Sequence, residues 1–89
     1  MLTQEITIIN VLGLHARAAA KFAALANQFT SDIGVKRGDR GVNGKSIMGL
    51  MMLAASKGTV ITLEISGADE TEMCEALVAL IENRFEEDE

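Results

Sequence analysis

The 89-residue sequence contains no proline, tryptophan or tyrosine, only one cysteine and only one histidine. A lone cysteine, Cys74, excludes an internal disulfide and is typical of a reducing compartment. With three phenylalanines as its only aromatic residues, the core must be built from aliphatic side chains, and 48% of the chain is hydrophobic. Length and composition therefore predict one domain, residues 1–89, with a single shared core.

Other absences narrow the functional classes. No run approaches the roughly 20 apolar residues that a membrane-spanning helix needs, so we expect a cytoplasmic protein without membrane insertion. The net charge of -5 and the scarcity of aromatic residues argue against a nucleic-acid partner. No second histidine or cysteine pair accompanies His15, so we expect no metal, no catalytic triad and no cofactor.

The charges are unevenly distributed along the chain. Six of the eight basic residues lie between positions 15 and 45, whereas nine of the thirteen acids lie between positions 69 and 89. Such a chain can present an anion-attracting face although it is acidic overall. The alternative is that these are ordinary solvated side chains, and only the fold decides between the two interpretations.

Hydrophobic spacing predicts the secondary structure. Alternating apolar residues indicate four strands, at 2–8, at two places within 31–44 as a hairpin, and at 58–66. Residues at helical spacing indicate three helices, the first beginning near Ala16, the second after Ser46 and the third after Asp69, with Ser46 and Asp69 as capping residues. The buried stripe expected in the first helix is Ala18, Phe22, Leu25 and Phe29.

The element order βαββαβα predicts the fold class. Four strands and three helices in so short a chain are typical of an α+β open-faced β-sandwich. In that architecture a four-stranded antiparallel sheet carries all three helices on one face.

His15 lies where a helix-capping Ser, Thr, Asp or Asn would be expected. The first amide groups of a helix lack partners and its N-terminus is partly positive, so a phosphoryl group on this imidazole would be stabilised there. Arg17, in the first turn, would add a charge-assisted hydrogen bond. The same positive end favours a neutral, nucleophilic ring. The alternative is a surface histidine that occupies a cap by accident.

The segment IMGLMMLAA, residues 47–55, has no polar side chain. A short helix on a sheet buries only one side, so part of this segment should remain exposed. Methionine suits a surface that must fit several partners, because its side chain is flexible and polarisable. The alternative is a fully buried central helix.

The segment GVNGKS resembles the end of a nucleotide-binding P-loop, G-x-x-x-x-G-K-[ST]. That pattern requires a glycine at position 39, where this chain has Asp39. A small nucleotide-binding enzyme is therefore a weak alternative, and it predicts ATP affinity that we expect to be absent.

Two segments together resemble a known family. GLHARAAAKF (13–22) and VNGKSIMGLMMLAASKGT (42–59), at this separation and in this strand order, are similar to the HPr family of histidine-containing phosphocarrier proteins. These proteins belong to the phosphoenolpyruvate-dependent sugar phosphotransferase system, and the resemblance covers essentially the whole chain.

The resemblance implies a stoichiometric phosphoryl carrier rather than an enzyme. His15 would accept a phosphoryl group on its pros nitrogen, Nδ1, from phosphorylated enzyme I and pass it to a histidine of an enzyme IIA domain. Arg17 matches the stabilising arginine of the family. Ser46 matches a regulatory site that an ATP-dependent kinase, HPr kinase/phosphorylase, modifies in some bacteria.

The resemblance also implies a docking surface and a monomeric state. The residues that match the docking surface are Ala20, Ala24, Ile47, Met48, Met51 and Met52. Ala18 departs from the family pattern, because many members have proline at this position, and we expect altered rates rather than lost function. An alternative role is mainly regulatory, either in the nitrogen-related branch of the family or through docking controlled by Ser46 phosphate.

Overall fold

The computed structural model describes all 89 residues and contains four strands and three α-helices. In chain order these are β1 (Leu2–Thr7), α1 (Ala16–Ala26), β2 (Asp32–Arg37), β3 (Arg40–Asn43), α2 (Ile47–Met52), β4 (Val60–Ser66) and α3 (Glu70–Glu82), followed by a short 3-10 helix, η1 (Arg84–Glu86). The predicted order βαββαβα is confirmed.

The strands form one antiparallel sheet in the order β1-β4-β2-β3. The inner strand β4 pairs with both β1 and β2, which places Ile65 between Leu2 and Ile33. Because paired residues of neighbouring strands share a face, their apolar side chains form one continuous row. The alternation seen in the sequence therefore defines the side of the sheet that is covered.

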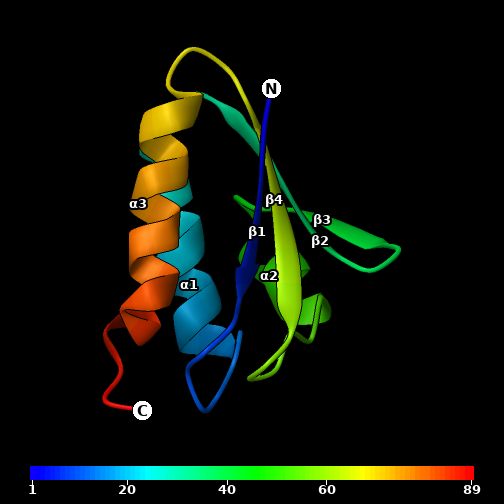
Figure 1. Cartoon of the computed structure of the whole chain (residues 1–89), viewed down its shortest axis with the longest axis vertical. Coiled ribbons are helices and arrows are strands. Elements are labelled where there is room, and N and C mark those ends of the chain that lie inside the picture. Colours follow the sequence, from blue (N-terminus) through cyan, green and yellow to red (C-terminus); the bar gives the residue numbers. More distant parts are fainter.

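The three helices cover that face (Figure 1). Helix α3 packs on β1 and β4, α2 packs against β3, and α1 contacts both other helices. The opposite face carries exposed polar side chains such as Thr3, Glu5 and Lys36. This arrangement confirms the predicted α+β open-faced β-sandwich.

Helices α1 and α2 run antiparallel to each other, and two hydrogen bonds show it. Just before α1, the amide of Leu14 donates to the carbonyl of Ala55, which follows α2, at 2.8 Å. Just after α1, Nδ2 of Asn27 donates to the carbonyl of Lys45, which precedes α2, at 3.1 Å. The start of α1 therefore lies beside the end of α2, and the end of α1 beside the start of α2.

The core agrees with the expected helical stripe only in part. Ala18 and Phe22 are fully buried, but Leu25 and Phe29 are only partly buried, and Phe29 lies beyond the end of α1 at Ala26. The other buried residues of α1 are alanines, and Phe85 is fully buried although it follows the last α-helix.

Asp69 occupies the N-cap position of α3, but its side chain does not cap the helix. Its carboxylate instead accepts hydrogen bonds from the amides of Thr30 and Ser31, each at 2.9 Å, and from the Ser31 hydroxyl. These bonds, led by the one from the Ser31 hydroxyl, lower the pKa of Asp69 to about 2. The predicted capping role is therefore wrong, and the residue joins α3 to the loop before β2.

The low pKa of Asp69 predicts acid sensitivity. Since the folded pKa lies below the usual value of 3.8, the ionised carboxylate stabilises the fold above about pH 4, and this contribution is lost as the pH falls toward 2. In urea titrations, the free energy of unfolding of Asp69→Asn should fall less steeply over that range than that of the wild type. Asp39→Asn, which removes an exposed acid in the hairpin turn, is the control. If the free energy of unfolding changed with pH in the same way in the wild type and in Asp69→Asn, the stabilising role of the ionised Asp69 carboxylate would be contradicted.

Gly13, two residues before His15, has a left-handed backbone conformation that favours glycine. Its φ is +65°, and a Cβ at this position would lie 2.5 Å from the Ala55 carbonyl oxygen and 2.8 Å from Cα of Ser56. Gly38 has a similar φ of +60° but open space around it, so it serves as a matched control. Alanine at either position would have to adopt the unfavourable left-handed backbone conformation, but only Gly13→Ala also brings a Cβ into collision with neighbouring backbone atoms.

Gly13→Ala should therefore destabilise the protein by about 1–3 kcal/mol more than Gly38→Ala does, since overpacking costs that much. Chemical denaturation of the two variants measures the difference. Equal losses of stability in the two variants would show that the backbone near Gly13 can move away from Ala55 and Ser56 at little cost.

Candidate functional site

His15 is the N-cap residue of α1, as the sequence predicts. Its backbone is extended, with φ -77° and ψ -178°, and its carbonyl accepts the first helical hydrogen bond from Ala19 at 2.8 Å. Its side chain makes no capping hydrogen bond. The imidazole is therefore held at the helix N-terminus without being used to complete the helix.

The first turn of α1 has free hydrogen-bond donors. The amides of Ala16, Arg17 and Ala18 donate to no acceptor in the chain. Together with the positive end of the helix dipole they form a site that favours an anion. Because residue 18 is alanine, it keeps an N–H group that a proline at this position would lack.

Two basic side chains of α1 differ in how they are held. Arg17 is exposed and makes no hydrogen bond or ion pair, and it borders an open cleft whose other lining residues are Val11, Leu12, Lys21 and the acidic residues 86–89. Lys21 is occupied, because its Nζ donates to the Phe85 carbonyl at 2.8 Å and pairs with Glu86 at 3.1 Å. Of the two, Arg17 is the cation free to meet an incoming oxyanion beside His15.

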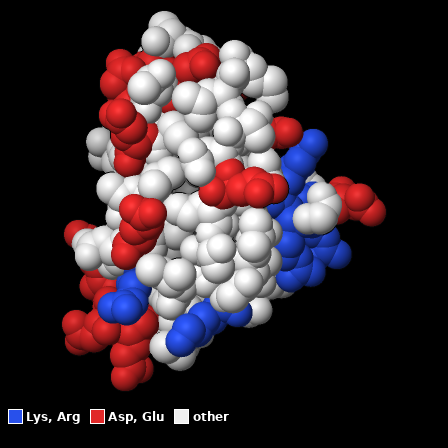
Figure 2. Space-filling view, viewed as in Figure 1, with Lys and Arg blue, Asp and Glu red and all other residues white.

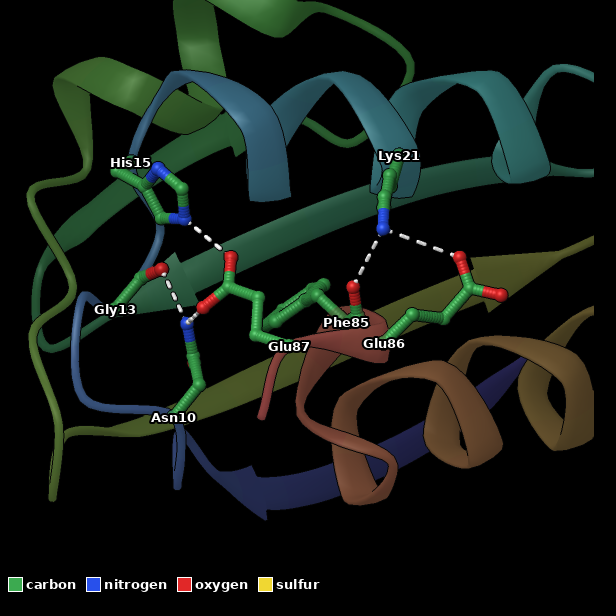
Figure 3. Close-up of polar contacts among 7 residues, drawn as sticks. All are labelled: Asn10, Gly13, His15, Lys21, Phe85, Glu86 and Glu87. Carbon is green, nitrogen blue, oxygen red and sulfur yellow. Dashed lines mark hydrogen bonds and ion pairs between the residues drawn. The ribbon is translucent and has the colours of Figure 1, made fainter. Parts of the chain in front are cut away.

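The C-terminal segment returns to the histidine (Figure 3). The carboxylate of Glu87 lies against Nε2 of His15 and accepts a hydrogen bond from Nδ2 of Asn10 at 3.0 Å. Burial acts to raise the pKa of Glu87, but the hydrogen bonds from His15 and Asn10 and the nearby charges of His15 and Arg17 hold it below its usual value. Glu87 is therefore an ionised partner of the imidazole at neutral pH.

The second helix exposes one side, so the alternative of a fully buried helix is wrong. Leu50 and Leu53 point into the core, whereas Met48 and Met52 are 69% and 66% exposed. Ile47 and Met51 are exposed as well. We call this set, Ile47, Met48, Met51 and Met52, the α2 apolar surface.

Helix α1 adds smaller side chains next to the α2 apolar surface. Ala24 is exposed and Ala20 half-buried, and both belong to the helix that packs against α2. Leu12, which is 65% exposed, and Val11 lie in the loop that leads to His15. These two loop residues are apolar and exposed at the site, and the sequence interpretation missed them.

Ser46 caps α2, as the sequence predicts, because its hydroxyl oxygen accepts a hydrogen bond from the amide of Gly49 at 3.0 Å. Since α1 and α2 are antiparallel, Ser46 lies near the end of α1 and His15 at its start. The start and the end of α1 are separated by eleven residues of helix, which is roughly 16 Å at 1.5 Å per residue. The structure therefore does not bring Ser46 into contact with His15.

Opposite charges gather on different parts of the molecule (Figure 2). Acidic side chains follow α3 and the C-terminal segment, and basic side chains cluster near the β2–β3 hairpin. Two arginines of that hairpin, Arg37 and Arg40, donate to the carbonyls of Ala54 and Met52 at 3.0 and 2.9 Å. The uneven charge distribution in the sequence thus becomes a basic border beside the end of α2.

No group of three or more His, Cys, Asp or Glu side chains is arranged to hold a metal ion. None of the helices combines the length and the apolar character that crossing a bilayer requires.

Comparison with known proteins identifies the family. Residues 2–83 match the family model described as the PTS HPr component phosphorylation site. The chain is 62% identical to the phosphocarrier protein HPr of Neisseria meningitidis serogroup A over the full length of both proteins. It is also 41% identical to the phosphocarrier protein NPr of Shewanella violacea, over 97% of this chain and 94% of that protein.

Solved structures agree with this assignment. The crystal structure of HPr-C-His from Thermoanaerobacter tengcongensis is 47% identical, covers both chains completely and superimposes with a TM-score of 0.96. An HPr dimer from the same organism is 50% identical, with a TM-score of 0.78 over 92% of this chain and 94% of that one. The chain therefore belongs to the HPr family, the phosphocarrier proteins of the phosphotransferase system.

Proposed function

We propose that His15 is the phosphoryl acceptor of this phosphocarrier and that Nδ1 is the atom that carries the group. The observation that supports this most directly is the position of His15 at the N-cap of α1, followed by three amides without acceptors. Nε2 is already engaged with Glu87, whereas Nδ1 makes no hydrogen bond. The lone pair of Nδ1 is the nucleophile in this proposal.

The proposed transfer moves one phosphoryl group between two nitrogens. The bond from phosphorus to the donor histidine of enzyme I breaks as a bond to Nδ1 of His15 forms, and the donor nitrogen keeps its electron pair. Little covalent assistance is required, since positioning and charge neutralisation dominate phosphoryl transfer. The free amides and the Arg17 guanidinium would receive the phosphoryl oxygens.

The α2 apolar surface, with Ala20 and Ala24, is the proposed docking site for enzyme I and for an enzyme IIA domain. Its exposure and its position beside His15 support this assignment. A carrier must bind both partners weakly and release them quickly, which a small apolar surface with a charged border allows. We propose that the protein docks as a monomer in the cytoplasm, where phosphoenolpyruvate is formed, and that it transfers the group without catalysing a reaction of its own.

Ser46 is the proposed regulatory phosphorylation site for an HPr kinase/phosphorylase. Phosphate there would lie at the start of α2, next to Ile47 and Met48 and far from His15. It would therefore act by placing negative charge in the docking surface rather than by touching the histidine. The second candidate is a mainly regulatory protein, either of the nitrogen-related branch or with docking that Ser46 phosphate controls; the 41% identity to a phosphocarrier protein NPr favours keeping it.

The variant His15→Ala separates the two candidates. Wild-type protein incubated with phosphoenolpyruvate and a catalytic amount of enzyme I should gain the mass of one phosphoryl group, which acid removes. His15→Ala should gain none, and Ser46→Ala should gain it normally. Intact-mass spectrometry measures all three proteins. Uptake by His15→Ala would refute the proposed acceptor, and no uptake by the wild type with active enzyme I would favour the regulatory candidate.

The variant Ser46→Asp tests the proposed control. We expect enzyme I to present an acidic surface to the basic border formed by Arg37 and Arg40. Because like charge at an interface costs several kcal/mol, the initial rate of transfer from such a partner should fall about tenfold or more. Ser46→Asn, which keeps a side chain able to cap the helix but adds no charge, is the matched control. Equal rates of transfer to Ser46→Asp and Ser46→Asn would contradict the proposal that negative charge at position 46 hinders docking.

A further inference from the structure

The segment after α3 is built into the fold and ends at the histidine. Arg84, Phe85 and Glu86 have φ values of +55°, +53° and +65°, so the chain turns sharply after the helix. The Phe85 side chain is fully buried, and Lys21 of α1 binds the Phe85 carbonyl and the Glu86 carboxylate. Because this left-handed turn is unfavourable for residues with side chains, the contacts must hold it in place.

A backbone hydrogen bond extends this anchoring to the chain end. The amide of Val11, in the loop before His15, donates to the carbonyl of Glu89 at 3.0 Å. Residues on both sides of Glu87 are therefore attached to α1 or to the loop that precedes it. The position of Glu87 is set by these attachments and by the burial of Phe85.

Both oxygens of the Glu87 carboxylate are engaged (Figure 3). Oε2 faces Nε2 of His15, and Oε1 accepts from Nδ2 of Asn10 at 3.0 Å. The side chain of Glu87 is only 11% exposed. A carboxylate with two fixed partners and little access to water has one orientation with respect to the ring.

Asn10 is oriented by its own surroundings. It is fully buried, and its Nδ2 donates both to Glu87 and to the Gly13 carbonyl at 2.9 Å. Both neighbours are acceptors, so turning the amide over would set oxygen against oxygen at each of them. Asn10 therefore connects the backbone turn at Gly13 to the carboxylate that faces His15.

The contact selects one tautomer of the histidine. An ionised carboxylate only accepts hydrogen bonds, so the proton of the neutral ring must reside on Nε2. The lone pair is then left on Nδ1, which has no partner in the chain. We propose that Glu87 is a positioning residue that holds His15 as the Nε2–H tautomer and so prepares Nδ1 for phosphorylation; this inference rests on the function proposed for His15.

The same contact would serve after transfer. When Nδ1 accepts the phosphoryl group, the proton stays on Nε2 and the ring gains a positive charge. The carboxylate of Glu87 faces that charge from the side away from the phosphoryl group, so no proton has to enter or leave. The depressed pKa of Glu87 agrees with a carboxylate that stays ionised in this position.

The test compares Glu87→Gln with Asp88→Asn. Each removes one charge from the same segment, but the Asp88 side chain is exposed and makes no hydrogen bond. The ring nitrogens of His15 are observed by ¹⁵N NMR in the unphosphorylated proteins at pH 8, where the tautomers of the neutral ring are compared. Wild type and Asp88→Asn should show mainly the Nε2–H tautomer, and Glu87→Gln should show a larger share of Nδ1–H.

The second measurement is the initial rate of phosphoryl acceptance from enzyme I. Hydrogen bonds to charged groups are typically strong enough to give a roughly tenfold effect, so Glu87→Gln should be about ten times slower than Asp88→Asn. An unchanged tautomer ratio in Glu87→Gln, or a rate equal to that of Asp88→Asn, would overturn the inference. A faster rate would also overturn it, because the segment would then be a cover that hinders transfer.

The two measurements keep this inference separate from the proposed function. The tautomer ratio needs no transfer and reports on Glu87 even if enzyme I never phosphorylates the protein. If the ratio shifts as expected while the wild type takes up no phosphoryl group, the proposed function fails and the tautomer assignment stands. If the wild type is phosphorylated on His15 and the ratio does not shift, only the role of Glu87 fails.

Discussion

The antiparallel packing of α1 on α2 is the constraint on which the site depends. It is fixed at one end by the bond from Leu14 to Ala55 and at the other by the bond from Asn27 to Lys45. As a result, His15, at the start of α1, lies near the end of α2, the helix that exposes the methionines. Without this pairing, the free amides at the start of α1 would not lie beside the helix that carries the α2 apolar surface.

Close approach of backbone to backbone makes the first of these bonds possible. Gly13 lets the chain pass against Ala55 and Ser56 at distances that a Cβ would prevent. Leu14 can then donate to Ala55 while His15 takes the N-cap position. The orientation of the histidine is thus set by a turn in which one residue has no side chain.

The fold could be predicted from the sequence because it depends on local periodicity. Alternation indicated the strands and helical spacing the helices, since each element has one covered face. The N-cap positions of His15 and Ser46 were equally local, because a cap depends only on the residues of the next helical turn. The assignment of Asp69 failed for the opposite reason: three donors from residues 30 and 31 compete for its carboxylate, and no local pattern shows them.

The contacts of the C-terminal segment could not be predicted from the sequence. Glu87 lies 72 residues from His15 and 77 from Asn10, and it belongs to an acidic stretch that looks like a solvated chain end. The one available signal was Phe85, a large apolar residue just past the last helix. Its burial needs a reversal of the chain, and that reversal is what brings the next residues back to α1.

The charges around His15 are divided between its two ring nitrogens. An anionic acceptor, Glu87, is fixed at Nε2, whereas the cation Arg17 has no partner and the first amides of α1 are free. In the proposed transfer, the hydrogen-bond acceptor is the fixed group, because the proton on Nε2 would stay in place throughout. The hydrogen-bond donors are free, as the proposal requires, because the phosphoryl group would arrive and leave with each cycle. A carrier that held its donors in internal bonds would have to break them each time, and the exchange would slow accordingly.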